Sequence, residues 1–352
     1  MIVYKFGGAS VRDATGIRNL YNLVLKEKGK LVVVVSAFGK TTNALEEVVN
    51  MWFRGEEGYS DRLSTLCRYH LSVTGELFGS GSAVADRITA SFSALHARLE
   101  NTVPGDYDHD YDMIVSMGEI WSTTVVEGYL RSQGLRSMWT DIRNLLVTDD
   151  RYRDAGIIMG ESAARIISAF TFSDADMYVT QGFIGATAEG EVTTLGREGS
   201  DYTAALVANM LDAEKMVVWK DVPGIMSADP RWLASAETIS NISYNEAVEM
   251  TFSGAKVIHP NTIKPLHNKK IPMHVRSFID HDAPGTVISE EPTRGEAKPI
   301  YIRKEDQILI SVLPKDLSFV MGENLAAETG FKCGLIGVHF PFTVIEFEAK
   351  DY

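Results

Sequence analysis

The stretch KLVVVVSAFG, residues 30–39, predicts a β-strand that is buried on both faces. Its valines do not alternate with polar residues, which is typical of a strand in a parallel sheet covered by helices on both sides. Glycine ends the strand, and residues 43–52 then carry apolar side chains at helical spacing. This stretch therefore favours an α/β protein.

The same order of elements extends outward from this stretch. IVYKF (residues 2–6) predicts a strand that ends at a pair of glycines and is followed by an amphipathic helix. MYVTQ, KMVVWK and IPMHVRSF predict further strands, and a hairpin is expected around residues 188–191. Alternating strands and helices predict a three-layer α/β/α sandwich with a mostly parallel sheet.

Two other regions differ in pattern. Residues 59–101 are helical throughout, with apolar stripes that we interpret as packing surface. Residues 291–299 are polar and include two prolines, which predicts a linker. Beyond the linker, residues 300–352 predict a short β-α-β-β tail. The sequence thus predicts a main domain over residues 1–290 and a small α+β tail.

Composition limits the classes of function. The 352 residues are 45% hydrophobic and carry a formal net charge of −13, which argues against a nucleic-acid partner. No apolar run reaches membrane-spanning length, and the opening MIVYKF lacks the pattern of a secretory signal. Two cysteines without metal-ligand spacing fit a reducing compartment. A cytoplasmic protein that contacts neither nucleic acid nor membrane is expected.

Five stretches place charged or hydroxyl side chains beside glycines or small residues, each where a strand is expected to end. In an open parallel sheet, ligands lie outside the carboxyl ends of the strands, so the five together indicate one site. A single glycine turn of this kind usually only reverses the chain. The stretches are YKFGGAS (4–10), SAFGKTTN (36–43), SMGE (116–119), GREGSD (196–201) and KDVPGI (220–225).

The charges at these turns indicate the ligands. Lys5, Arg197 and Lys256 suit phosphate and carboxylate oxygens, and Glu119 and Asp201 could take an ammonium group. A polyphosphate and a small amino acid would satisfy both sets. Taken singly, Glu119 is better read as a helix cap and Lys256 as a surface lysine, whereas Lys5 beside a double glycine is not.

The stretch GREGSD predicts a helix start whose N-cap is Ser200 or Asp201. The unpaired N–H groups and the positive end of the helix dipole would suit an anion. The P-loop, the dinucleotide GxGxxG, the HExxH metal motif and the kinase HRD loop are absent from the sequence. His259 before Pro260 is interpreted as structural.

At these residues the chain resembles aspartate kinases of the amino acid kinase family. KFGGAS, SAFGKTTN, SMGE, TLGREGSDYTAALVA, KDVPGI, ADPR (228–231) and SGAKVIHP (253–260) follow in that family's order over about the first four-fifths of the chain. The resemblance implies an α/β/α sandwich with an amino-acid lobe over about residues 1–195 and a nucleotide lobe over about 196–290. It also implies that the tail is about half of a ligand-binding (ACT) module.

The resemblance further implies an activity and a set of site residues. The activity is ATP-dependent phosphorylation of the L-aspartate side chain, with Mg²⁺ bridging the phosphates and no metal held by the protein alone. A homodimer through the tail would be possible. The implied residues are Lys5 and Asp201 as catalytic, Thr42, Glu119, Arg197 and Ser200 around aspartate, and Gly7, Gly8, Lys220, Asp221, Arg231 and Lys256 around the nucleotide.

Four positions depart from the pattern of the family: Ala9 replaces a threonine, Glu198 a glycine, Lys220 a threonine and Met226 a tyrosine. Glu198 would place an anion beside the phosphate site unless its side chain points away. Two other functions stay open from the sequence. One is a kinase of the same fold for another acidic substrate, such as glutamate or a nucleoside monophosphate, and the other is a non-catalytic amino-acid sensor.

Overall fold

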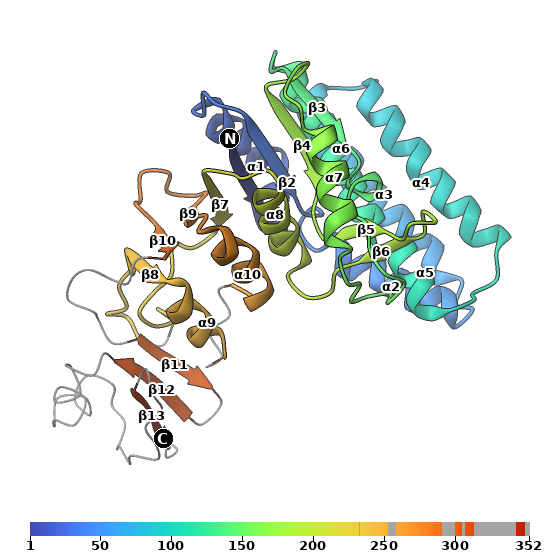
Figure 1. The fold of residues 1–352 in the computed structure, drawn as a ribbon. Coiled ribbons are helices and arrows are strands. Elements are labelled where there is room, and N and C mark those ends of the chain that lie inside the picture. The colour runs from blue at the N-terminus through green and yellow to red at the C-terminus, as the bar shows by residue number, and fades with distance from the viewer. Residues whose placement is uncertain (232, 253–257, 291–299, 305–306, 313–342, 349–352) are drawn as a thin grey trace. The chain divides into compact units, whose positions relative to one another are not determined.

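A computed structural model describes residues 1–231, 233–252, 258–290, 300–304, 307–312 and 343–348 of the chain (Figure 1). The chain divides into two compact units, Met1–Asp221 and Val222–Tyr352. The expected lobe boundary at residues 195–196 and the domain boundary at residue 290 stay predictions.

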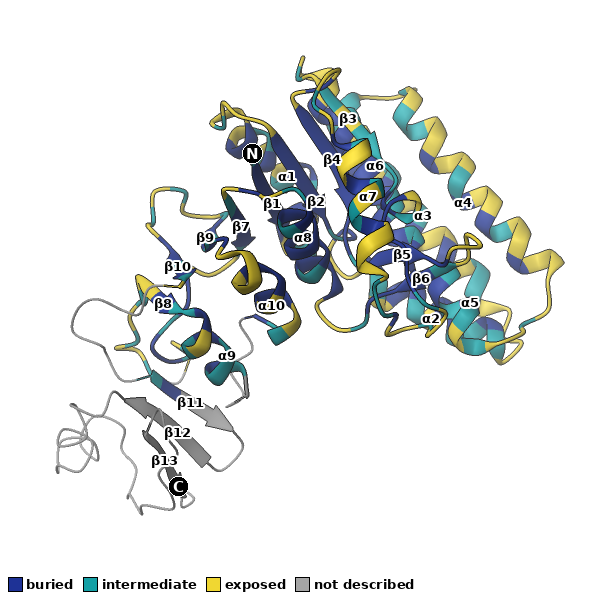
Figure 2. Cartoon of the chain, in the orientation of Figure 1, coloured by how far each residue is buried: buried dark blue, intermediate teal, exposed yellow. Residues whose placement is uncertain are grey.

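The first unit contains a fully parallel run of strands in the order β3-β4-β2-β1-β7. Its central strands are buried along their whole length, as Figure 2 shows, and Lys5 lies between Val34 and Val218 on the neighbouring strands. The strands are β1 (Ile2–Phe6), β2 (Leu31–Val35), β3 (Ser137–Thr140), β4 (Met177–Gln181) and β7 (Lys215–Lys220). The predicted parallel sheet is confirmed.

Helices flank this sheet, which confirms the three-layer sandwich. The α8 helix packs on β1, β2 and β7 and contacts α7, whereas α6 packs on β2, β3 and β4 and contacts α1 and α3. The helical elements are α1 (Ala14–Leu25), α2 (Thr41–Phe53), α3 (Gly58–Phe78), α4 (Ala83–Asn101), α5 (Tyr107–Val115), α6 (Met117–Ser132), α7 (Met159–Ala169), α8 (Gly199–Met210), and the 3-10 turns η1 (Gly8–Val11) and η2 (Ile142–Asn144).

The helical segment expected over residues 59–101 forms the pair α3 and α4. Its stripes are buried, with Leu63 and Leu66 on α3 and Phe92 and Leu95 on α4 each at most 6% exposed. The interpretation of these stripes as packing surface is confirmed. The expected hairpin also forms, as the antiparallel strands β5 (Ile184–Ala186) and β6 (Val192–Thr194).

One strand prediction is wrong. The apolar residues before SMGE do not form a strand, because residues 107–115 form α5 and SMGE lies at its junction with α6. The side chain of Asp106 caps α5 by accepting a hydrogen bond from the His109 N–H group at 2.9 Å. A short apolar run fits either a strand or the end of a buried helix. Here the Asp106 cap favours the helix.

The second unit contains a small mixed sheet in which β10 (Thr286–Ser289) pairs parallel with β8 (Asn241–Ser243) and antiparallel with β9 (Met273–Ser277). Its helices are α9 (Tyr244–Phe252) and α10 (Pro260–Lys269). The ring of His259 caps α10 by accepting from the Asn261 N–H group, which agrees with the structural role expected for this histidine.

The tail contributes the antiparallel sheet β11-β12-β13, formed by β11 (Ile300–Lys304), β12 (Gln307–Val312) and β13 (Thr343–Glu348). The tail helix, the tail strand expected from CGLIGVHF (residues 333–340) and the linker predicted over residues 291–299 lie outside the described residues, so the half-ACT interpretation stays a prediction. Among the described helices, none is both long enough and apolar enough to span a bilayer.

Candidate functional site

A buried carboxylate between two ammonium groups lies at the carboxyl edge of the sheet in the first unit. Lys5 is the penultimate residue of β1, and its Nζ lies 2.6 Å from Oδ1 of Asp201 in the first turn of α8. Lys220 ends the neighbouring β7, and its Nζ lies 3.5 Å from Oδ2 of the same carboxylate. Lys5 and Asp201 are 8% and 2% exposed. We call these three residues the lysine–aspartate cluster.

The cluster keeps its aspartate ionised. Burial acts to raise the pKa of Asp201, but the charges of Lys5 and Lys220 outweigh it and lower the pKa to about 2. Lys5 and Lys220 thus place two amine groups against one ionised carboxylate. The first turn of α8 adds the positive end of a helix dipole, so the arrangement favours an anion.

Glu198 also lies at this cluster. It is the N-cap of α8 and adopts a left-handed conformation with φ 57°, so the prediction that Ser200 or Asp201 caps this helix is wrong. Partial burial and the neighbouring Asp201 carboxylate raise the pKa of Glu198, against the opposing effect of Lys220 and Lys5. Its carboxyl group therefore does not point away from the cluster.

The loop after β1 is held tightly against the loop after β2. The Gly39 N–H group donates to the Gly8 carbonyl at 3.0 Å. A Cβ atom on Gly8 would come within 2.7 Å of the Ala37 carbonyl oxygen and 2.8 Å of the Gly39 carbonyl oxygen, whereas a Cβ on Gly7 would lie 3.5 Å from the Lys5 Nζ. Only glycine fits at position 8, which brings backbone N–H groups close to the cluster.

Glu119 is a buried acid beside this loop. It lies in the first turn of α6, is 2% exposed, and accepts a hydrogen bond from the Ala37 N–H group at 3.3 Å through Oε1. Its Oε2 has no hydrogen-bond partner among the described residues. Burial raises the pKa of Glu119 to about 8, although the Ala37 N–H group and Lys5 oppose this. Glu119 lies in the first turn of the helix that it was expected to cap, and its side chain is buried there.

The raised pKa of Glu119 predicts a pH-dependent stability. Between pH 4.5 and about 8, the folded chain keeps a proton on Glu119 that the unfolded chain has released. The unfolding free energy should fall as the pH rises through this window, because the folded state binds more protons. Urea unfolding of the wild type and of Glu119→Gln at several pH values measures this. The wild type should lose stability relative to the variant, and a constant difference would contradict the assignment.

Two residues that sequence reasoning missed hold the loop that leads to α8. Asp112, fully buried in α5, accepts from the Thr194 N–H group at 2.7 Å, the Thr194 hydroxyl at 2.6 Å and the Arg153 N–H group at 2.9 Å. Gly182 follows β4, and a Cβ there would come within 2.6 Å of the Ser200 Cα. A glycine directly after a predicted strand could have indicated Gly182. Asp112 lies in the stretch that was wrongly predicted as a strand, and no local pattern marked it as a buried acceptor.

Asp112→Ala should lower the unfolding free energy by about 2–4 kcal/mol, because it leaves buried donors without an acceptor. The matched control is Asp108→Ala on the same helix, which removes an exposed ion pair with Arg153. That control should cost less than about 1 kcal/mol. Urea unfolding of the two variants compares them, and equal losses would show that Asp112 does not anchor β6.

The other residues predicted for the substrate lie near these loops in the sequence and differ in exposure. Thr42 is half-buried in the first turn of α2, and Ser200 is buried at the start of α8 against Gly182. Arg197 is exposed, and its side chain makes no hydrogen bond or ion pair with the described residues. Its guanidinium group is thus available to a ligand.

The residues predicted for the nucleotide are less closely gathered. Asp221 is exposed at the end of the first unit. Arg231 belongs to the second unit, where it is exposed and forms an ion pair with Asp229. Lys256 lies outside the described residues. Of the predicted nucleotide set, the structure therefore brings Gly7, Gly8 and Lys220 to the lysine–aspartate cluster.

Comparison with known proteins decides the family. The model described as the amino acid kinase family matches residues 1–277. The chain belongs to this family. As an amino acid kinase it is 33% identical over 291 residues to lysine-sensitive aspartokinase 3 of Escherichia coli, and 31% identical over 303 residues to bifunctional aspartokinase/homoserine dehydrogenase 2 of Arabidopsis thaliana. Each match covers 82% of this chain.

A solved structure agrees over nearly the whole of this amino acid kinase. E. coli aspartokinase III in complex with aspartate and ADP superposes with a TM-score of 0.79 at 28% identity, covering 99% of this chain and 79% of that one. The curated relatives are longer. The matches cover 64% of the E. coli enzyme and 32% of the bifunctional Arabidopsis protein.

Proposed function

We propose that this chain is an aspartate kinase that transfers the γ-phosphoryl group of ATP to the side-chain carboxylate of L-aspartate, giving 4-phospho-L-aspartate and ADP. The lysine–aspartate cluster carries the proposal. It places a buried, charged lysine beside a glycine loop and a helix start. The names of its relatives support the same activity, since two are aspartokinases and one was solved with aspartate and ADP.

The chemistry needs no general base. A side-chain carboxylate has an ordinary pKa of about 3.9, so the acceptor oxygen of aspartate is a nucleophile at neutral pH. It attacks the γ-phosphorus, the bond from phosphorus to the bridging oxygen breaks, and ADP leaves with that electron pair. The protein has to align the two groups and neutralise charge on the equatorial oxygens.

In this proposal Lys5 carries the electrostatic part of catalysis. Asp201 holds the Lys5 ammonium group at 2.6 Å, which fixes its position at the end of β1. The N–H groups of Gly7 and Gly8 and the start of α8 would donate to the phosphoryl oxygens. Glu198 would hold the ammonium groups in place until substrate arrives, because its carboxyl group lies at the same cluster.

The other predicted residues would bind the remaining groups of aspartate and ATP. Arg197, exposed and without a partner among the described residues, would clamp the α-carboxylate of aspartate. Glu119 would face the ammonium end, and Thr42 and Ser200 would line the same subsite. The nucleotide would be held by Lys220 together with Asp221, Arg231 and Lys256.

Mg²⁺ would be carried mainly by the phosphate oxygens. The buried acid of the cluster, Asp201, is already paired with two ammonium groups and is a poor candidate ligand. When bound, the ion would neutralise charge on the β- and γ-phosphates. We further propose a cytoplasmic enzyme, able to form a homodimer, that supplies the first step of lysine, threonine and methionine biosynthesis.

Trapping the acyl phosphate with hydroxylamine tests the reaction. The chain is incubated with Mg-ATP and, separately, with L-aspartate, L-glutamate or N-acetylglutamate, with and without lysine or threonine. Hydroxamate from aspartate alone is the expected result. Hydroxamate from another acid would identify a different kinase of the same fold. If no acid gives hydroxamate while the folded chain still binds aspartate, the chain is a sensor and the proposal fails.

A further inference from the structure

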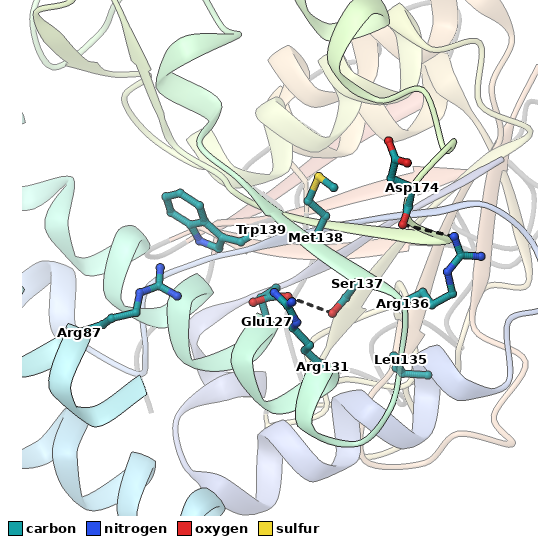
Figure 3. Close-up of a pocket in the computed structure, with 9 residues that line it drawn as sticks. All are labelled: Arg87, Glu127, Arg131, Leu135, Arg136, Ser137, Met138, Trp139 and Asp174. Carbon is teal, nitrogen blue, oxygen red and sulfur yellow. Dashed lines mark hydrogen bonds between the residues drawn. The ribbon is translucent and has the colours of Figure 1, made fainter. Parts of the chain in front are cut away.

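A pocket lies at the opposite end of the parallel strands from the lysine–aspartate cluster. It has a volume of about 450 Å³, within the range of small-molecule sites, and forms around the amino end of β3 (Figure 3). Ser137 is the first residue of β3, whereas Lys5 and Lys220 lie at the carboxyl ends of β1 and β7. Because these strands are parallel, the length of a strand separates the two places, and the catalytic proposal does not use this pocket.

The centre of the pocket is a buried carboxylate. Glu127 of α6 is 5% exposed and accepts a hydrogen bond from the Ser137 hydroxyl at 3.2 Å. Burial raises the pKa of Glu127, while the charges of Arg131 and Arg87 oppose the rise. Among the described residues, its one hydrogen bond is to this neutral hydroxyl, so the pocket can offer the carboxylate to a cation.

Two guanidinium groups flank this carboxylate without binding it. Arg87 comes from α4 and Arg131 from the last turn of α6, and both are exposed. Neither side chain makes a hydrogen bond or an ion pair within the part of the chain that the structure describes, although both act on Glu127 through their charge. Arg136 differs, because it binds the Asp174 carbonyl and Asp176. Arg87 and Arg131 are therefore the donors available to a ligand.

An aromatic wall completes the pocket. The indole of Trp139 is half-buried and is fixed by donating to the Thr123 hydroxyl at 3.0 Å. Ser137 and Trp139 alternate with Met138 along β3, so both face α6 and lie on the side of Glu127. The ring supplies an apolar surface beside the charged groups.

This combination selects the charge pattern of the ligand. A dianion such as phosphate would suit the two arginines, but it would lie beside the buried Glu127 carboxylate and be repelled. A simple cation would suit Glu127 but be repelled by both arginines. A zwitterion satisfies both, because its carboxylate and its ammonium group are joined at one carbon atom.

We propose that this pocket binds a free α-amino acid with an apolar side chain. Its α-carboxylate lies on Arg87 and Arg131, its ammonium group on Glu127, and its side chain against Trp139. The site is independent of the proposed kinase reaction, because none of its residues belongs to the lysine–aspartate cluster or the loops around it.

Calorimetric titration of the full chain with L-leucine tests the site. Two analogues separate the contacts: 4-methylpentanoate lacks the ammonium group, and L-leucinamide lacks the carboxylate. Leucine should bind, and each analogue should bind at least about tenfold more weakly, as expected for the loss of a charged hydrogen bond.

Variants locate the site. Arg131→Ala and Glu127→Gln should each weaken leucine binding by about tenfold or more. The matched control is Arg98→Ala, an exposed arginine of α4 outside the pocket, which should leave binding unchanged. Arg131 is exposed, so its variant should fold even if Glu127→Gln does not. Absence of leucine binding, equal binding of 4-methylpentanoate, or binding unaffected by Arg131→Ala would each overturn the proposal.

Discussion

Lys5→Ala is expected to lower kcat for aspartate phosphorylation by about 10²–10³-fold, the range found when a positioned charge donor is removed from a reacting oxyanion. Lys5 is 8% exposed, and its ion pair with Asp201 holds the ammonium group at the end of β1. In the proposed reaction its ammonium group faces the phosphoryl oxygens, where charge develops. The hydroxamate assay with Mg-ATP and aspartate measures the loss.

The same variant should still fold. Removing one partner of a buried ion pair normally leaves a costly unpaired charge. Here Asp201 keeps Lys220 at 3.5 Å, so the unfolding free energy should fall by only about 1–3 kcal/mol. Lys215→Ala, at the amino end of the neighbouring β7, is the matched control and should retain full activity. Near-normal turnover in a folded Lys5→Ala protein would remove Lys5 from the mechanism.

The sheet could be predicted from sequence because its strands are buried on both faces. Residues 31–35 and 177–181 are buried throughout, so their runs of apolar and uncharged side chains need no alternation. Gly7 and Gly182 directly follow β1 and β4 and mark where these strands end, whereas β2 ends at Val35, four residues before Gly39. Local sequence therefore indicated the strands better than their ends, and parallel pairing follows from the helices between them.

The helix α5 shows where this reasoning stops. Its sequence is a short run of apolar and acidic residues, a pattern that fits a strand and a helix equally well. The Asp106 cap is local, but the burial of Asp112 depends on Thr194, which lies 82 positions further along the chain. No local pattern reveals a contact over that distance, so both the element and its anchoring residue were missed.

The sequence predicted where the candidate site lies, but not how its side chains pair. Lys5, Asp201 and Lys220 come from separate stretches, and the rule that ligands lie beyond the carboxyl ends of parallel strands brought these stretches together. Which acid pairs with which lysine depends on side-chain geometry. The orientation of Glu198 likewise depends on its left-handed backbone, which only the structure shows.

Gly8→Ala is expected to combine a loss of stability with a larger loss of activity. The added Cβ would lie 2.7 Å from the Ala37 carbonyl oxygen and 2.8 Å from the Gly39 carbonyl oxygen. Both neighbours are backbone atoms, so the strain cannot be relieved by rotating a side chain. Overpacking of this kind costs about 1–3 kcal/mol of unfolding free energy.

The loss of activity in Gly8→Ala should be larger than its loss of unfolding free energy alone would cause. The Gly39 N–H group donates to the Gly8 carbonyl, so the loops after β1 and β2 must move together when position 8 is forced outward. Lys5 lies three residues before Gly8, and a displacement of about 1 Å at a reacting centre can cost about 10²-fold in rate. We therefore expect kcat/KM for ATP to fall by about 10²-fold in a protein that remains folded at 25 °C.

Gly29→Ala provides the matched control for this substitution. A Cβ on Gly29 meets nothing within 4 Å, so the same chemical change is made without a contact. Because alanine restricts the unfolded chain, this control should be neutral or more stable by up to about 1 kcal/mol, with unchanged kinetics. If Gly8→Ala behaved like Gly29→Ala in both urea unfolding and turnover, the two loops would not be fixed against each other. The lysine–aspartate cluster would then owe its geometry to the ion pairs alone.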